Sequence, residues 1–146
     1  MARRKSQRFE ILQKLASKYE DIAAQALGKS VSNVDAQKAR LAELKQFREE
    51  YTQQFYASGV EGISGATIQS YQNFIRQLDL AIEQQIRTVF AAESDQTQKK
   101  DVWQGKHRTT RIYQKTKDQF SAKEQKEQDR REQKELDDRT HGVKSK

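Results

Sequence analysis

The sequence predicts an all-α protein, a long antiparallel coiled-coil hairpin of two helices, and three observations predict it. The 146 residues include no proline, and good helix formers such as Ala, Gln, Glu, Lys and Leu dominate nearly every window. Apolar residues recur at alternating steps of three and four, the heptad spacing of helices that pair. Three glycines fall within residues 59–65, where they make it easy for the chain to reverse direction.

Residues 9–57 form the first expected helix, which would be roughly 70 Å long at 1.5 Å per residue. Its apolar residues fall into two stripes separated by a one-residue phase shift near Leu27 and Gly28. The first stripe contains Leu12, Leu15, Tyr19, Ile22 and Ala26, and the second contains Val34, Leu41, Leu44, Tyr51 and Phe55. Neither helix is apolar enough to be stable alone, so the fold requires that the stripes of the two helices pair.

A glycine-rich turn is expected at 58–66, with Ser64 or Thr67 as the cap of the second helix at 67–120. The apolar seam of this helix stays in one register: Ile68, Tyr71, Ile75, Leu78, Ile82, Val89, Ala92, Trp103, Tyr113 and Phe120. Six polar residues interrupt it, namely Gln85, Gln96, Lys99, Lys106, Thr110 and Lys117. Because most of them lie in its later half, looser packing is expected there.

The two ends of the chain look unable to order themselves. Residues 1–8 are a basic segment, expected to be flexible. Residues 121–146 carry eight basic and seven acidic side chains, and Leu136 is their one large apolar candidate. This tail is expected to be a solvated helix, supported by pairs of opposite charge four residues apart, or to be disordered.

Composition excludes several classes of protein. There is no cysteine, and the two histidines, His107 and His141, are isolated, so no metal centre is expected and His107 is interpreted as a surface residue. No nucleophile stands beside a base in a known motif, and no glycine-rich phosphate loop is present. The sequence therefore predicts a protein that is not an enzyme and has no cofactor and no small-molecule substrate.

The charge and hydropathy of the chain bear on its location and partners. The net charge of +7 and the pI near 9.6 indicate acidic partners of some kind. No stretch approaches the roughly 20 apolar residues of a membrane span, and the first five residues lead into no signal sequence. A cytoplasmic location is therefore expected.

Aromatic residues beside the predicted seam indicate a docking surface. Phe47 and Phe74 fall on the flanks, where a two-helix hairpin would leave them exposed. Each belongs to a stripe near the turn. The stripe of the first helix contains Leu44, Phe47 and Tyr51, and that of the second contains Phe74, Leu78 and Ala81. Exposed aromatic clusters are typical of protein interfaces. A wide seam, a third helix or a second copy of the chain would also cover them.

A basic segment at 99–117 raises the alternative of nucleic-acid binding. Its seven Lys and Arg residues are interleaved with Trp103 and Tyr113, and such a pattern can hold a single strand by phosphate contact and base stacking. Here both rings occupy heptad core positions, so stacking would remove them from the seam. A protein partner is therefore the preferred interpretation.

Residues 71–85 resemble the flagellar export protein FliJ family. They read Tyr-Gln-x-Phe-Ile-x-x-Leu-x-x-Ala-Ile followed by Glu-Gln, and a glycine-containing turn precedes them. Weaker agreement at Ala23, Ala24, Leu27, Gly28 and the stripe from Leu44 to Tyr51 extends the resemblance over roughly residues 9–90.

The resemblance implies a coiled coil similar to the stalk subunit of rotary ATPases, within the flagellar type III export apparatus at the cytoplasmic face of the inner membrane. The partners it implies are the ring of the export ATPase FliI, whose assembly is promoted, the export gate protein FlhA, and export chaperones. Contact with the membrane would occur only peripherally, through these partners.

The resemblance also implies site residues. The gate-facing set would be Arg40, Leu44, Phe47, Tyr51, Phe74, Leu78, Ala81 and Gln85. The set available to the ATPase ring would be Arg3, Arg4, Lys5, Arg8, Lys99, Lys100, Arg108 and Arg111. A basic coiled coil that binds nucleic acid and a generic self-associating coiled-coil adapter are the alternatives.

Overall fold

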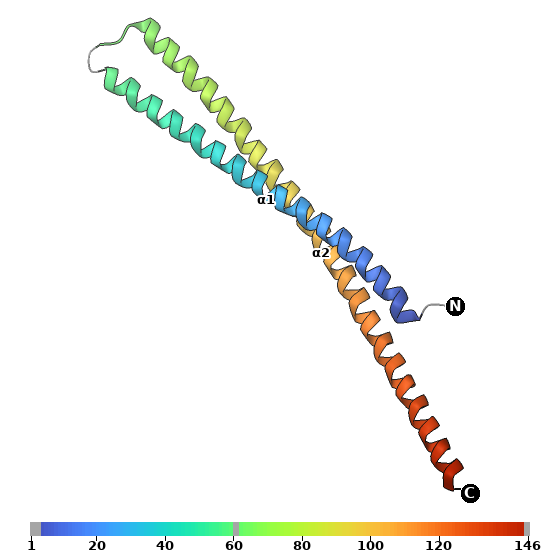
Figure 1. The fold of residues 1–146 in the computed structure, drawn as a ribbon. Coiled ribbons are helices and arrows are strands. Elements are labelled where there is room, and N and C mark those ends of the chain that lie inside the picture. The colour runs from blue at the N-terminus through green and yellow to red at the C-terminus, as the bar shows by residue number, and fades with distance from the viewer. Residues whose placement is uncertain (1–3, 60–61, 145–146) are drawn as a thin grey trace. The chain divides into compact units, whose positions relative to one another are not determined.

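The computed structural model describes residues 4–59 and 62–144, which form two helices. Helix α1 covers Lys5–Ser58 and helix α2 covers Gly65–Lys144 (Figure 1). The two helices pack against each other as a hairpin, and the described residues contain no strand. The predicted all-α helical hairpin is therefore confirmed.

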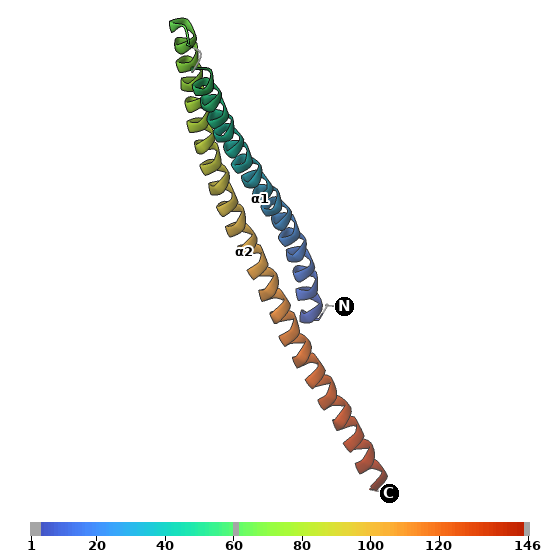
Figure 2. The same ribbon diagram turned by 90° about the vertical axis from the view of Figure 1, so that its left-hand side faces the viewer.

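The chain divides into two compact units. The turn unit is Ala24–Asp101, and the terminal unit combines Met1–Ala23 with Val102–Lys146. Both helices contribute to each unit. Within the turn unit, Figures 1 and 2 show from two directions that the later part of α1 lies beside the first part of α2.

Helix α1 begins at Lys5, four residues before the expected Phe9. The Arg4 amide donates a hydrogen bond to Gln7 Oε1 at 3.3 Å, as in the reciprocal half of a capping box. In the same first turn, the Ser6 hydroxyl and amide both donate to the Glu124 carboxylate of α2, at 2.5 and 3.3 Å. These contacts with α2 fix residues that the sequence alone predicts to be flexible.

The chain reverses between Ser58 and Gly65. Gly62 has φ = +88°, a left-handed conformation that a side chain would strain, and its amide donates to the Gly59 carbonyl. The Thr67 amide donates to Ser64 Oγ at 3.2 Å, which identifies Ser64 as the cap of α2. Val60 and Glu61 of the expected turn lie outside the described residues.

The charged tail is helical as far as Lys144. From 125 to 142 its side chains are exposed, and pairs four residues apart along the helix support it. One is the Arg131–Glu127 ion pair at 3.4 Å, and amide to carboxylate hydrogen bonds repeat the spacing. Each such pair contributes only a few tenths of a kcal/mol, so this segment depends on helix propensity.

In the turn unit the predicted seam is confirmed. The side chains of Val34, Leu78, Val89 and Ala92 are less than a tenth exposed. The other large apolar residues predicted for the seam of this unit are half-buried, except Ile68, which is 40% exposed. The half-buried ones are Leu41, Leu44, Tyr51, Phe55, Tyr71, Ile75 and Ile82. Two polar residues, Ser30 and Gln85, are also buried in this seam. The core is a narrow line of heptad positions.

In the terminal unit the predicted stripe of α1 is wrong. Leu12, Leu15, Tyr19 and Ile22 are 40–55% exposed. The buried residues are instead Ala16 and Ala23, and together with Phe9 they continue the heptad register of the turn unit back along α1 without a phase shift. The facing part of α2 supplies three half-buried rings, Trp103, Tyr113 and Phe120. Phe9 of α1 packs against two of them, with ring centroids 6.2 Å from Tyr113 and 5.4 Å from Phe120.

Candidate interaction surfaces

Five aromatic rings join the helices next to the turn, and we call them the aromatic ladder: Phe47, Tyr51 and Phe55 of α1 with Tyr71 and Phe74 of α2. Phe55 stacks on Tyr71 with ring centroids 3.7 Å apart, and Tyr51 lies 5.7 Å from Tyr71 and 4.5 Å from Phe74. Each aromatic pair adds about 0.5–1.5 kcal/mol beyond its buried area. The ladder therefore stabilises the end of the hairpin.

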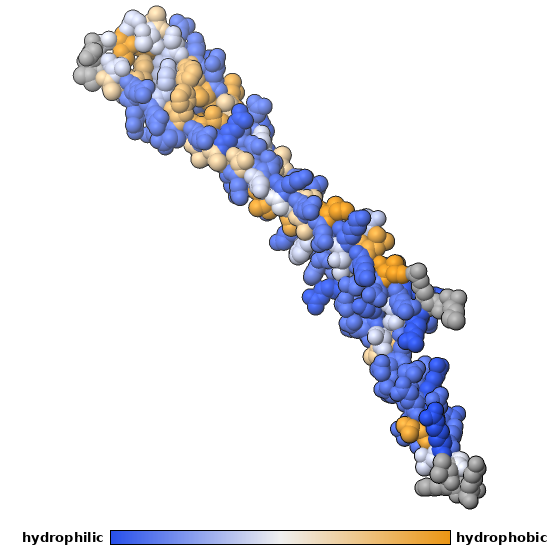
Figure 3. Space-filling model, in the orientation of Figure 1, coloured by the Kyte–Doolittle hydropathy of each residue, from blue (hydrophilic) through white to orange (hydrophobic). Residues whose placement is uncertain are grey.

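Phe47 is the exposed edge of the ladder. Its ring touches Phe74 edge-on at 6.1 Å, yet 48% of the residue remains exposed. Phe74 is half-buried between Phe47 and Tyr51, so the expectation that a hairpin leaves Phe74 exposed is corrected. Figure 3 shows hydrophobic residues gathered on the surface at this end of the turn unit.

The structure separates the predicted gate-facing residues by their exposure. Arg40 and Phe47 are exposed, and Leu44, Tyr51, Phe74 and Ala81 are half-buried. Leu78 and Gln85 are both 8% exposed, within the seam. A partner would therefore reach the first six and would meet Leu78 and Gln85 only by opening the hairpin.

Gln85 forms a polar layer with Gln37 inside the turn unit. Its side-chain amide donates to the Gln37 backbone carbonyl at 3.0 Å and to Gln37 Oε1 at 2.9 Å. A polar core position of this kind fixes helix register, because misalignment would bury an unpaired amide. We therefore assign Gln85 to alignment of the helices.

An ion pair crosses the seam close to the aromatic ladder. Arg48 Nε lies 2.6 Å from Asp79 Oδ1, and a second hydrogen bond of 3.3 Å reaches the other carboxylate oxygen. The hydrogen bond from Arg48 lowers the pKa of the Asp79 carboxyl below its ordinary value. The pair is partly exposed, so it contributes more to orientation than to stability.

The predicted ATPase-facing residues fall in both units. Arg4, Lys5, Arg8, Arg108 and Arg111 belong to the terminal unit, whereas Lys99 and Lys100 lie at the edge of the turn unit. Arg3 lies outside the described residues. Two of these cations already have partners: Lys5 lies over the Phe120 ring at 5.4 Å, and Lys99 is 3.7 Å from Asp95.

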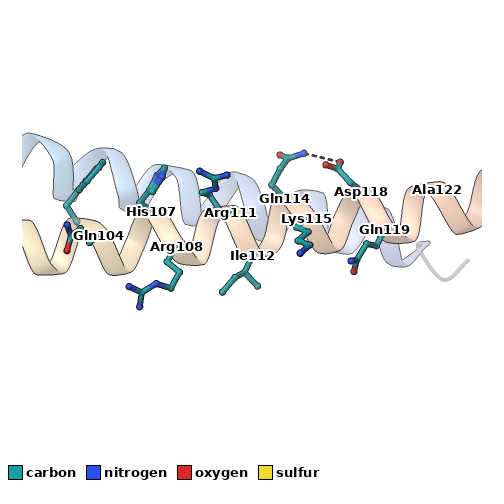
Figure 4. A pocket seen from close by; sticks show the side chains of 11 residues that line it. Gln104, His107, Arg108, Arg111, Ile112, Gln114, Lys115, Asp118, Gln119 and Ala122 are labelled. Carbon is teal, nitrogen blue, oxygen red and sulfur yellow. Dashed lines mark hydrogen bonds between the residues drawn. The ribbon is translucent and has the colours of Figure 1, made fainter.

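Arg108 and Arg111 line a surface groove of about 1060 Å³ along α2 in the terminal unit (Figure 4). Ile112, which is 55% exposed, and Lys115 also line this groove. The Gln114 side-chain amide donates a hydrogen bond of 3.0 Å to Asp118. In Figure 4, Arg108, Ile112 and Lys115 point to one side of α2 while Arg111 points to the other. The groove combines several cations with the apolar side chains of Trp103, Ile112 and Ala122.

His107 is half-buried and paired, which corrects its interpretation as a surface residue. Its Nδ1 lies 2.5 Å from Glu20 Oε1 of α1, and its ring stacks on Trp103 at 5.2 Å. The hydrogen bond with His107 lowers the pKa of the Glu20 carboxyl below its ordinary value. The two residues lie 87 positions apart in the sequence, so no local pattern could have indicated the pair.

The lowered pKa of Glu20 predicts an acid-sensitive terminal unit. A carboxyl whose pKa is depressed by folding contributes stability above its unfolded pKa, about 4.3, and loses it as pH falls through the folded value. Glu20→Gln should therefore flatten the loss of stability between about pH 5 and pH 3. The free energy of unfolding at each pH is measured by urea unfolding, followed by the fluorescence of Trp103, the one tryptophan.

His107→Leu removes the hydrogen bond to Glu20, so the pKa of that carboxyl is no longer lowered and the curve should flatten in the same way. An unchanged acid dependence in both variants would show that the pair contributes nothing to folding.

Among residues 4–59 and 62–144, no group of three or more His, Cys, Asp or Glu side chains is arranged to hold a metal ion. Neither described helix has a stretch both long and apolar enough to cross a membrane.

The described residues thus form a helical hairpin with exposed aromatic and basic side chains. The chain belongs to the FliJ family: the family described as Flagellar FliJ protein matches residues 5–141 of its 146 residues. It is thus a coiled-coil component of the flagellar export apparatus, associated with the machinery of protein transport. The FliJ family is a non-catalytic part of that apparatus. Comparison with curated proteins and with solved structures gave no match.

Proposed function

We propose that this chain is a stalk-like adapter that links the ring of the export ATPase FliI to the export gate protein FlhA. In this proposal the terminal unit contacts the ring and promotes its assembly, and the turn unit docks on the gate. The protein then works at the cytoplasmic face of the inner membrane and reaches the membrane only through its partners. The observation that carries the proposal is the exposed edge of the aromatic ladder at Phe47.

The gate contact is supported by the chemistry around Phe47. Rings that are ordered before binding lose little conformational entropy when a partner covers them. Phe47 is already held against Tyr51 and Phe74, with centroids 6.4 and 6.1 Å away. The partly exposed Leu44 and Ala81 provide further apolar contact, and the exposed Arg40 provides a charge. Aromatic and arginine side chains are the ones that most often dominate interface energy.

The ring contact is supported by the cations of the terminal unit. Arg8, Arg108 and Arg111 are exposed, and no salt bridge to them is found among the described residues. Guanidinium groups bind carboxylates bidentately, so an acidic ring lumen would suit them. Export chaperones are the third class of partner in this proposal, and they follow from family membership rather than from a particular surface.

Phe47→Ala tests the gate contact. We expect affinity for the purified cytoplasmic domain of FlhA to fall about tenfold, because truncation removes an ordered ring from the centre of the interface. The helical hairpin should remain folded, since nearly half of Phe47 is already exposed. Isothermal titration calorimetry measures the affinity, and circular dichroism checks the fold.

Tyr56→Ala is the matched control. Tyr56 is 70% exposed and lies nine positions from Phe47, which places it on the opposite side of α1. It should leave the affinity within about twofold of the original. Equal losses in both variants, or no loss in Phe47→Ala, would contradict the assignment of the ladder to the gate.

A further inference from the structure

The terminal unit carries a second apolar surface that the proposed function does not use. Leu12, Leu15, Tyr19 and Ile22 recur at steps of three and four along α1, and each is at least 40% exposed. Ile11, beside them, is 48% exposed. In Figure 3 hydrophobic atoms lie along this N-terminal part of α1. A stripe of this spacing is the pattern by which a helix packs against another helix.

A groove runs along the inner edge of the stripe. It has a volume of about 200 Å³ and is lined by Leu12, Leu15 and Tyr19 of α1 and by Lys106, Thr109 and Tyr113 of α2. All of these residues belong to the terminal unit. Side chains from two helices therefore form the walls of the groove, so a third helix could pack into it. From Leu12 to Ile22 the stripe spans about 15 Å of helix, which suits a partner segment of about three turns.

The charges at the edges of the stripe indicate what would bind there. Lys14 and Lys18 are exposed, and they form a row four residues apart beside Leu15 and Tyr19. On the inner edge, the Lys106 ammonium lies over the Tyr19 ring at 5.8 Å. Of these cations only Lys14 forms an ion pair among the described residues, with Glu10 at 3.5 Å. Lys18 on the outer edge and Lys106 on the inner edge are therefore the cations available to a partner.

We propose that this groove docks an amphipathic helix of a partner protein whose apolar stripe is flanked by Asp and Glu residues. The partner helix places apolar residues at every third or fourth position on Leu12, Leu15 and Tyr19, while its carboxylates face Lys18 and Lys106. A second copy of the chain fits poorly, because contact between two such stripes brings Lys14 and Lys18 near the same residues of the other molecule. The groove residues are not among those proposed for the ring and gate contacts, so substitutions in the groove test this proposal separately from them.

Two synthetic helical peptides test the proposal on the full chain. Both carry leucine at heptad core positions over three heptads; one has Glu on both flanks and the other has Lys at the same places. We expect the Glu peptide to bind saturably and at least about tenfold more tightly than the Lys peptide, and added salt should reduce the difference. Fluorescence anisotropy of the labelled peptides measures the affinities.

Leu15→Ser should weaken binding of the Glu peptide by about tenfold, with unchanged circular dichroism because Leu15 is 48% exposed. Leu80→Ser is the control, since Leu80 is 59% exposed and lies in the turn unit, and it should bind like the original chain. Equal binding of both peptides, or binding that survives Leu15→Ser, would overturn the proposal. A dimer in sedimentation that Leu15→Ser abolishes would assign the groove to a second copy and would also overturn it.

Discussion

Leu78→Asp should lower the free energy of unfolding by at least about 3 kcal/mol, the largest stability effect expected in the turn unit. Leu78 is 8% exposed in the seam, so a carboxylate there would lose its water without gaining a partner. Urea unfolding followed by circular dichroism gives the change. The same variant also tests the expectation that Leu78 faces the gate.

Leu80→Asp is the matched control, because it is the same substitution two positions further along α2 at a residue that is 59% exposed. We expect it to change stability by no more than about 0.5 kcal/mol. If the two variants were equally stable and Leu78→Asp alone lost gate binding, Leu78 would belong to the docking surface and the assigned seam would be incorrect.

The double exchange Arg108→Glu, Arg111→Glu should reduce the ability of the chain to assemble the FliI ring by on the order of thirtyfold. Both guanidinium groups line the groove of α2. If they meet carboxylates of the ring as proposed, reversing their charge would replace attraction with repulsion. Sedimentation of the purified ATPase, titrated with the variant at several salt concentrations, measures the effect.

A control of equal charge is Arg76→Glu, Arg87→Glu, at two exposed positions of α2 in the turn unit. This pair should leave ring assembly nearly unchanged. An equal loss in the control would indicate that net charge, rather than the terminal unit, governs the interaction.

Much of the fold was predictable because the heptad pattern of α2 is strong. Large apolar residues such as Leu78 and Val89 occupy its core positions. The three glycines within residues 59–65 mark the place where the chain reverses direction. The same pattern failed at the start of α1. There, hydrophobicity favours Leu12 and Leu15, whereas the register imposed by the rest of the hairpin buries Ala16. Two stripes compete on one helix, and only the partner helix decides between them.

The candidate sites were predictable to a smaller extent, for a related reason. Spacing along one helix places Phe47 on a flank, but it cannot show that Phe74 reaches across to cover part of it. Likewise, the sequence shows Gln85 only as a polar interruption of the seam, because its partner Gln37 lies on the other helix. His107 looks isolated in the sequence for the same reason, since its partner Glu20 lies on α1. These pairings join residues that are far apart in the sequence, so only the folded hairpin reveals them.

The hydrogen bonds between Gln85 and Gln37 have a mechanical consequence. If α1 and α2 slid past each other by one heptad, Gln85 would face Ser30 or Leu44 and its amide would lose the side-chain acceptor Gln37 Oε1. The layer therefore acts as a stop against slippage under load. Force applied to one helix would therefore be passed to the other, because the shifted registers have a higher free energy than the register in the structure.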